Sequence, residues 1–278
     1  MRRRSMMALM ALVALAVLAG SARAQDVGSV ADLQGGLDIG RDTTWTPAAI
    51  GVPIQLHDEL RTAKGGRAVV VFRDGSVLVV GESSQVMVDE QVFDPAQSLY
   101  QSTLKLLRGK VRALVSDYYK QPRSQFRIET HTAVSGVRGT EFVVTFDPIA
   151  DVSDVVGVEG QVEVHSVLDP INRGVFVTRM ELTRVARGKL PTPVRRLDEP
   201  VFRQYLEGLE FIGDGRPESM VHNNGVLLGT DVPVPFRPGE FARFSLRGPI
   251  AGPPPVYPKL PPYSPPVLGG PGDVNVRF

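Results

Sequence analysis

The 278-residue chain contains no cysteine. This absence excludes thiol catalysis, cysteine zinc sites, thiol redox chemistry and a lipid-anchored mature form. Histidine is scarce as well: His57, His131, His165 and His222 are scattered, with no HExxH or other metal-ligand spacing. We therefore interpret each histidine as a surface or turn residue, and we predict neither a metal nor a cofactor.

An excess of either charge is also missing, because 31 Lys and Arg balance 30 Asp and Glu. Nothing in this balance suggests a nucleic-acid partner, which would require a basic surface. Without disulfides, the stability of the fold must come from the burial of apolar surface and from strand pairing.

The first 24 residues have the pattern of a secretory signal peptide. Three arginines precede an apolar run over residues 6–19, and Ala22-Arg23-Ala24 forms a small-x-small cleavage site. The run is short for a bilayer span, which needs about 20 residues. We predict cleavage before Gln25, a periplasmic or secreted mature protein, and no stable membrane span after cleavage. Retention of the segment as an anchor is the alternative.

Glycine turns between short β-branched runs predict strands over most of residues 57–190. AVVVF (68–72) and SVLVV (76–80) flank Asp74-Gly75, a strong hairpin signal, and Glu159-Gly160 lies between two similar runs. We expect positive φ at Gly75 and Gly160. Arg108-Gly109 is interpreted as the same kind of turn. The glycines are unevenly spaced, so the pattern indicates a meander or an irregular coil rather than a strict repeat.

The apolar pattern within these runs predicts which faces are buried. Phe126 and Ile128 alternate with Arg127 and Glu129, and QVEVHSV alternates in the same way. Each of these strands should therefore have one solvent-exposed face. VVVF and EFVV are continuously apolar and should be covered on both faces.

The rest of the chain divides by composition. A helix is predicted over residues 198–211, with Asp198 as N-cap and with Val201, Tyr205 and Leu206 on one face. The proline-rich end should be extended, as a spacer or as a ligand for an aromatic groove of a partner. The predicted units are the signal peptide (1–24), lead-in strands (25–56), the β domain (57–190), an accessory region with the short helix (191–246) and the proline-rich tail (247–278).

Four segments, taken in order, resemble the FecR domain over about residues 57–165. They are LRTAKGGRAVVVFRDGSVLVVGESSQVMV (60–88), LLRGKVRAL (106–114), FRIETHTAVSGVRGTEFVV (126–144) and VVGVEGQVEV (155–164). The resemblance implies an all-β domain, solenoid-like or a sandwich, without catalytic residues, on exported proteins of bacterial envelopes. The structural motif residues it marks are Asp74, Gly75, Ser76, Gly109, Gly136, Arg138, Gly139, Thr140, Phe142 and Gly160.

Two departures from the family pattern limit what carries over. Thr130 is followed by His131, where the family usually has Thr-Pro. Related iron-uptake regulators place a sigma-binding segment before a membrane helix, whereas only MRRRSMM precedes the apolar run here, so we do not expect an anti-sigma role. Within the motif, we expect Arg138 to donate to backbone carbonyls, Thr140 to satisfy a turn amide and Phe142 to enter the core.

Three functions remain open at this point. The first is a non-catalytic binding or scaffold module for an envelope protein or a cell-wall polysaccharide. The second is a periplasmic relay that works with a separate membrane regulator. The third is a carbohydrate hydrolase, with Glu82 and Glu90 or Asp151 and Asp154 as a carboxylate pair, which would have to stand about 5 to 9.5 Å apart.

Overall fold

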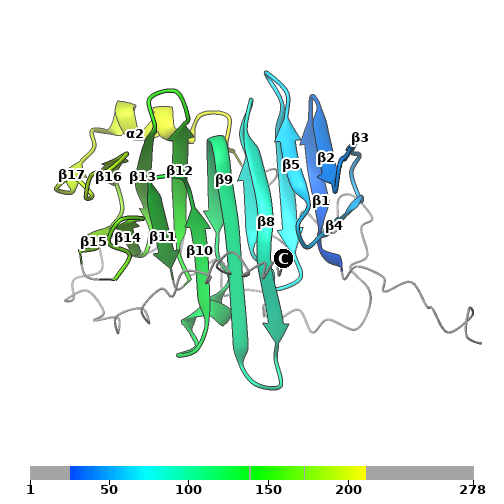
Figure 1. The fold of residues 1–278 in the computed structure, drawn as a ribbon, viewed down its shortest axis with the longest axis horizontal. Coiled ribbons are helices and arrows are strands. Elements are labelled where there is room, and N and C mark those ends of the chain that lie inside the picture. Colours follow the sequence, from blue (N-terminus) through cyan, green and yellow to red (C-terminus); the bar gives the residue numbers. More distant parts are fainter. Residues whose placement is uncertain (1–25, 138, 172, 211–278) are drawn as a thin grey trace, which may run out of the picture.

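The computed structural model describes residues 26–137, 139–171 and 173–210. The predicted signal peptide, Arg138 and the proline-rich tail lie outside the described residues. The described strands form a network of 17 strands, which confirms the all-β prediction (Figure 1). None of the helices in this part of the chain is long and apolar enough to cross a bilayer.

The strand pairings fall into two sheets that share one long strand, β9 (Leu99–Leu114). Sheet A is antiparallel throughout. Its order is β4 (Pro53–Gln55), β1 (Asp26–Gln34), β6 (Arg67–Phe72), β7 (Val77–Val80), β9, β12 (Glu141–Asp147), β13 (Val152–Glu159), β16 (Glu181–Ala186) and β17 (Arg195–Arg196).

Sheet B is antiparallel except for the parallel pair β9 and β10. Its order is β3 (Thr44–Pro47), β2 (Leu37–Arg41), β5 (Glu59–Thr62), β8 (Gln85–Asp94), β9, β10 (Gln125–Glu129), β11 (Ala133–Val137), β14 (Val162–Ser166) and β15 (Val175–Val177). Strands that precede residue 57 therefore pair with strands that follow it in both sheets.

The passage of β9 from one sheet to the other corrects one prediction. Arg108-Gly109 is not a turn between two strands, because β9 continues through it and exchanges its partners β8 and β10 for β7 and β12. Gly109 has φ +87°, and a Cβ there would lie 2.2 Å from Ser84 Oγ. Glycine permits both the positive φ and the close approach, so the strand bends without reversing.

A single apolar core fills the space between the two sheets. Phe126 and Ile128 of sheet B contribute to it together with Phe142 and Val144 of sheet A. Arg127 and Glu129 are only partly buried, as the alternation predicts. Side chains of both sheets meet in this core, as in a sandwich.

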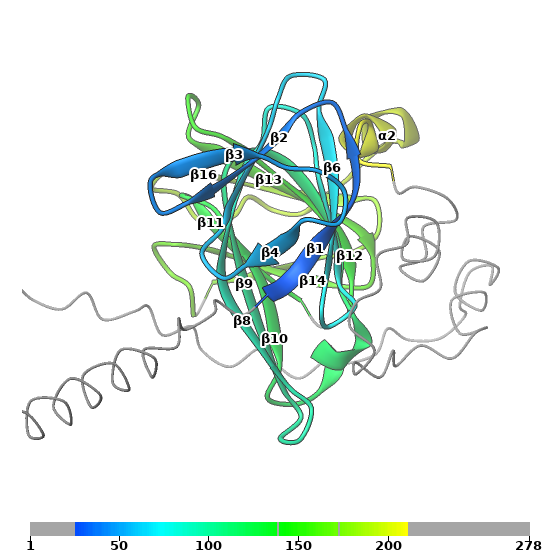
Figure 2. The same ribbon diagram turned by 90° about the vertical axis from the view of Figure 1, so that its right-hand side faces the viewer.

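The outer face of sheet A is also apolar, which confirms the prediction for VVVF and EFVV. Val69 and Val143 belong to a second buried cluster, on the side of sheet A away from the main core. This cluster includes Phe202 of helix α2 (Glu199–Leu206). The helix lies outside the strands, beside β6 (Figure 2).

The predicted helix was too long, and one residue of its buried face was wrong. The helix begins after Asp198 as N-cap but ends at Leu206, and Gly208 follows with φ +71°. Phe202 rather than Val201 is buried, because the apolar positions that face the sheet are 202, 205, 206 and 209. A glycine at positive φ ends a helix more readily than it continues one.

Candidate functional site

Most residues of the family motifs, namely Asp74, Gly75, Ser76, Gly139, Thr140 and Gly160, lie at one end of the sandwich, whereas Gly109 and Gly136 lie elsewhere. The β6–β7 turn, the short 3-10 helix η1 (Asp117–Lys120), the start of β12 and the end of β13 meet there, since Leu114 pairs with both Val77 and Glu141, and Glu141 pairs with Glu159. We name this region the motif end. Gly75 has φ +80° and Gly160 has φ +76°, so the positive φ predicted for both is confirmed.

A buried hydrogen-bond network holds the motif end together. Asp74 accepts hydrogen bonds from the Ser76 amide at 2.7 Å and from the Tyr119 hydroxyl at 2.5 Å. Ser76 Oγ accepts from the Ser116 amide at 3.1 Å. Burial raises the pKa of the Asp74 carboxyl, and the hydrogen bonds from Tyr119 and Ser76 act in the opposite direction. The side chains of Asp74 and Ser76 thus connect the β6–β7 turn to η1 and the residue before it.

The glycine and threonine positions of the motif are used for close packing. A Cβ at Gly139, where φ is +67°, would lie 2.7 Å from Lys120 Cε. The Thr140 hydroxyl donates to the carbonyl oxygen of Gln161 at 3.2 Å, rather than accepting from a turn amide as predicted. Phe142 is fully buried in the core, as expected. Gly136 lies apart from this end, within β11, opposite Arg127 and Glu163.

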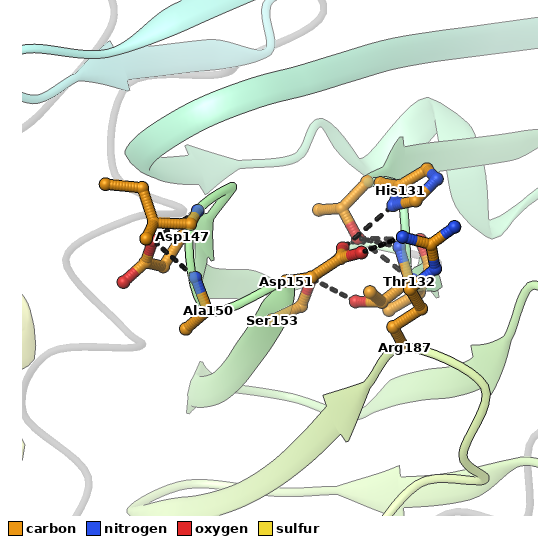
Figure 3. Close-up of polar contacts among 10 residues, drawn as sticks. His131, Thr132, Asp147, Ala150, Asp151, Ser153 and Arg187 are labelled. Carbon is orange, nitrogen blue, oxygen red and sulfur yellow. Dashed lines mark hydrogen bonds and ion pairs between the residues drawn. The ribbon is translucent and has the colours of Figure 1, made fainter.

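The opposite end of the sandwich carries a different kind of surface. We name it the loop end and define it as residues 130–132, 147–153, 167–171 and 187. At its centre, Asp151 Oδ1 lies 2.8 Å from His131 Nδ1, and Asp151 Oδ2 lies 3.5 Å from Arg187 Nη1 (Figure 3). The Arg187 amide donates to the Asp151 carbonyl at 2.9 Å. Asp151 therefore joins three loops.

A second set of contacts at the loop end ties the two sheets together. Ser153 Oγ lies 2.7 Å from Thr130 Oγ1 and 2.7 Å from Thr132 Oγ1 (Figure 3). Ser153 is the second residue of β13 in sheet A, whereas the threonines follow β10 in sheet B. The serine is buried and both of its hydroxyl contacts are to threonine. Although Ser153 is close in sequence to Asp151, its hydroxyl has the environment of a structural group rather than of a nucleophile.

The loop end presents exposed aliphatic side chains on a fixed backbone. Ile149 is 97% exposed, and Leu168, Ile171 and Val167 are 62%, 51% and 43% exposed. Asp147 Oδ1 accepts from the amides of Ile149 at 2.8 Å and Ala150 at 3.2 Å, which fixes the β12–β13 turn (Figure 3). The Val167 amide donates to the Thr132 carbonyl at 3.1 Å.

The carboxylates considered for hydrolysis each have partners of their own. Asp154 accepts a bidentate pair of hydrogen bonds from Arg184, at 2.6 and 2.8 Å, and a third from Tyr205 at 2.7 Å. Glu82 accepts from the Gly65 amide, and Glu90 accepts from Thr103. Within residues 26–137, 139–171 and 173–210, no group of three His, Asp or Glu side chains is placed to hold a metal ion.

One histidine differs from the prediction. His165 is buried, and its Nε2 lies 3.1 Å from Glu163 Oε1 on the outer face of β14. Gly174 lies so close to the imidazole ring that a Cβ there would be 2.4 Å from it. The outer face of β14, which was predicted to be exposed to solvent, is therefore covered at His165 by the chain that follows β14.

Sequence reasoning missed Tyr119, Ile149 and the partners of Asp151. Tyr119 and Asp74 are 45 residues apart, so no local pattern connects them. For Ile149, an aliphatic residue inside the turn sequence DPIAD was a signal that could have been used.

Comparison with known proteins supports the resemblance to the FecR domain. Residues 58–163 match the family model described as FecR protein, so the chain contains a FecR domain. Two crystal structures of a "putative anti-sigma factor" from Parabacteroides distasonis ATCC 8503 are similar to this chain with 16% sequence identity. Their TM-scores are 0.42 and 0.43, and the matches cover 59% of this chain and 72% and 71% of those chains. No curated protein sequence matches this chain at a significant level.

Proposed function

We propose that this FecR domain is a non-catalytic binding module of the bacterial cell envelope and that the loop end is its binding surface. The observation that carries the proposal is Ile149, an almost fully exposed isoleucine at the tip of a turn that Asp147 holds in place. A side chain presented on a fixed backbone loses little conformational entropy on binding. The aliphatic character of Val167, Leu168 and Ile171 favours a protein partner over a polysaccharide.

The place of action follows from the sequence. The arginine-rich start, the short apolar run and Ala22-Arg23-Ala24 support export and cleavage before Gln25. We therefore assign the mature protein to the periplasm or the exterior of the cell, with an envelope protein as its partner.

A signal relay is the second candidate, and the match of residues 58–163 to the FecR family favours it. In this role, binding at the loop end would be communicated to a separate membrane regulator. The state of the N-terminus separates the two candidates. An uncleaved chain that begins at Met1 and stays in the membrane would favour a tethered relay, whereas a mature protein that begins at Gln25 would favour a free module.

Site-specific crosslinking in the envelope of the native host tests the binding surface. A photoreactive amino acid replaces Ile149 in one variant of the full chain and Ile50 in a matched control, because Ile50 is 43% exposed but lies between β3 and β4. We expect a discrete protein adduct from position 149 and none from position 50. Equal labelling at both positions, or an adduct with polysaccharide alone, would contradict a protein-binding loop end.

A further inference from the structure

The outer face of sheet A is covered by a segment of the same chain that follows the FecR match. Residues 197–210, which we name the strap, comprise Leu197, helix α2 and the turn after it. The strap covers an apolar surface of β1, β6, β7, β12, β13 and β16. The buried sheet residues in this surface are Ala31, Val69, Val71, Val77, Val79, Val143, Val156 and Leu182.

Few apolar side chains hold the strap on this surface. Leu197, Phe202 and Leu209 are its buried residues, with Tyr205 and Leu206 partly buried beside them. Strand pairing contributes little, because β17 consists of two residues that pair with β16, followed by one hydrogen bond from the Leu197 amide to the Met180 carbonyl at 2.7 Å. The strap thus has far fewer contacts than a central strand such as β12, which pairs along its length on both sides.

One polar contact positions the helix. The Tyr205 hydroxyl donates to Asp154 Oδ2 at 2.7 Å, and the same carboxylate receives both hydrogen bonds of Arg184. Because Asp154 and Arg184 are paired across β13 and β16, this acceptor is present whether or not the strap is in place. Sheet A therefore offers a preformed site for a hydroxyl donor on a helix.

Basic side chains of sheet A receive the end of the strap. Arg112 Nη1 donates to the Leu209 carbonyl at 3.1 Å, and Arg67 Nη1 donates to the Glu210 carbonyl at 3.1 Å. Lys110 Nζ donates to the Glu207 carbonyl. The carbonyl end of a helix carries partial negative charge, which cations stabilise. Helix α2 ends at Leu206 with Glu207 as its C-cap, so Lys110 contacts the helix end. The Leu209 and Glu210 carbonyls belong to the turn after the helix, and Arg112 and Arg67 hold that turn.

We propose that the strap opens and closes in the folded protein, and that the surface beneath it is a docking site for an amphipathic helix, occupied in cis by the strap itself. The site combines an apolar surface, the Asp154 acceptor and a cation, Lys110, at the helix C-terminus. A competing partner helix would need an apolar stripe, a hydroxyl donor toward Asp154 and a free C-terminal carbonyl near Lys110. This inference goes beyond the binding role proposed for the loop end, because it concerns another surface. Its tests do not depend on that role.

Hydrogen exchange of the full chain tests the opening. Segments with few contacts open locally, so we expect the amides of Phe202, Glu207 and Leu209 to exchange at least about tenfold faster than those of β12. Tyr205→Phe should further increase the exchange rates of the strap amides and leave those of the β12 amides unchanged. The matched control Tyr118→Phe should change neither set of rates. Equal exchange rates for the strap and β12, in the wild type and in Tyr205→Phe, would overturn the proposal.

A peptide of residues 195–210 tests the docking site. In a full-chain variant with Phe202→Ser and Leu209→Ser, the strap is weakened and the surface of sheet A is intact. We expect the labelled peptide to bind this variant at least about tenfold more tightly than the wild type, since the wild-type strap competes in cis. A peptide with the same two serines should not bind. Failure of the unmodified peptide to bind, or loss of β12 protection in the variant, would show that the strap is an integral part of the fold.

Discussion

The hydroxyl of Tyr119 donates a hydrogen bond to the buried carboxylate of Asp74 across 45 residues of sequence. The bond connects η1, which follows β9, to the tight turn between β6 and β7. A residue of the family motif therefore depends on a tyrosine outside the motif.

Tyr119→Phe should destabilise the protein by about 1–3 kcal/mol, because it leaves a buried acceptor without one of its donors. The ring contacts of Tyr119 with Phe126 and Tyr100 are retained in phenylalanine, so packing should change little. Urea unfolding of the purified protein measures the difference. Tyr118→Phe is the matched control, and an equal loss of stability in both variants would contradict the importance of the bond to Asp74.

The raised pKa of Asp74 predicts a pH dependence of stability. A carboxyl whose folded pKa lies above its unfolded value of about 3.9 stabilises the fold below that value, and this contribution is lost as pH rises through the folded pKa. The free energy of unfolding of the wild type, relative to Asp74→Asn, should therefore decrease from pH 3 upward. Urea unfolding at a series of pH values gives this difference. A relative stability that increases with pH would mean that hydrogen bonding outweighs burial.

Gly75→Ala should cost about 1 kcal/mol, because its φ of +80° is unfavourable for a residue with a Cβ. Gly36→Ala serves as the control, since a Cβ there would meet Ala63 Cβ at an ordinary 3.4 Å and no positive φ is required. Denaturant melts of the two variants beside the wild type measure both effects. Equal costs would show that backbone conformation is not what selects glycine in the β6–β7 turn.

Tyr205 should titrate at an elevated pH, because burial and the hydrogen bond to Asp154 raise its pKa to about 12. Asp154→Asn removes the charge that opposes ionisation, so the pKa of Tyr205 should decrease toward its usual value of about 10. Difference absorbance of the tyrosinate follows the titration, with Tyr205→Phe identifying the signal. An unchanged titration in Asp154→Asn would contradict the contact between helix α2 and β13.

Removal of residues 247–278 should leave the melting temperature nearly unchanged, since a segment so rich in proline offers little apolar surface for burial. A thermal melt of the truncated chain beside the full chain tests this expectation. A decrease of more than a few degrees would show that the tail packs on the domain.

Local patterns predicted much of the fold. The alternation of Phe126 and Ile128 with charged neighbours identified a core strand, and the positive φ of Gly75 and Gly160 followed from their place between strand-like runs. The double-sided burial of β6 also followed from its continuous apolar run. In each case the information lies within a few residues.

Features that depend on distant pairing were not predictable in this way. A glycine at positive φ serves equally in a turn and in a strand bend, and the pairing of β9 on both sides of Gly109 distinguishes it from Gly75. The partners of Asp154 come from β16 and α2, which become neighbours only through the topology of sheet A. The loop end likewise gathers His131, Asp151 and Arg187 from separate loops.

The shared strand β9 also determines how the domain unfolds. It pairs with β8 and β10 in one sheet and with β7 and β12 in the other, so neither sheet keeps its central strand if β9 detaches. The two sheets therefore constitute one cooperative unit, and the FecR region should unfold in a single transition at which different spectroscopic probes coincide.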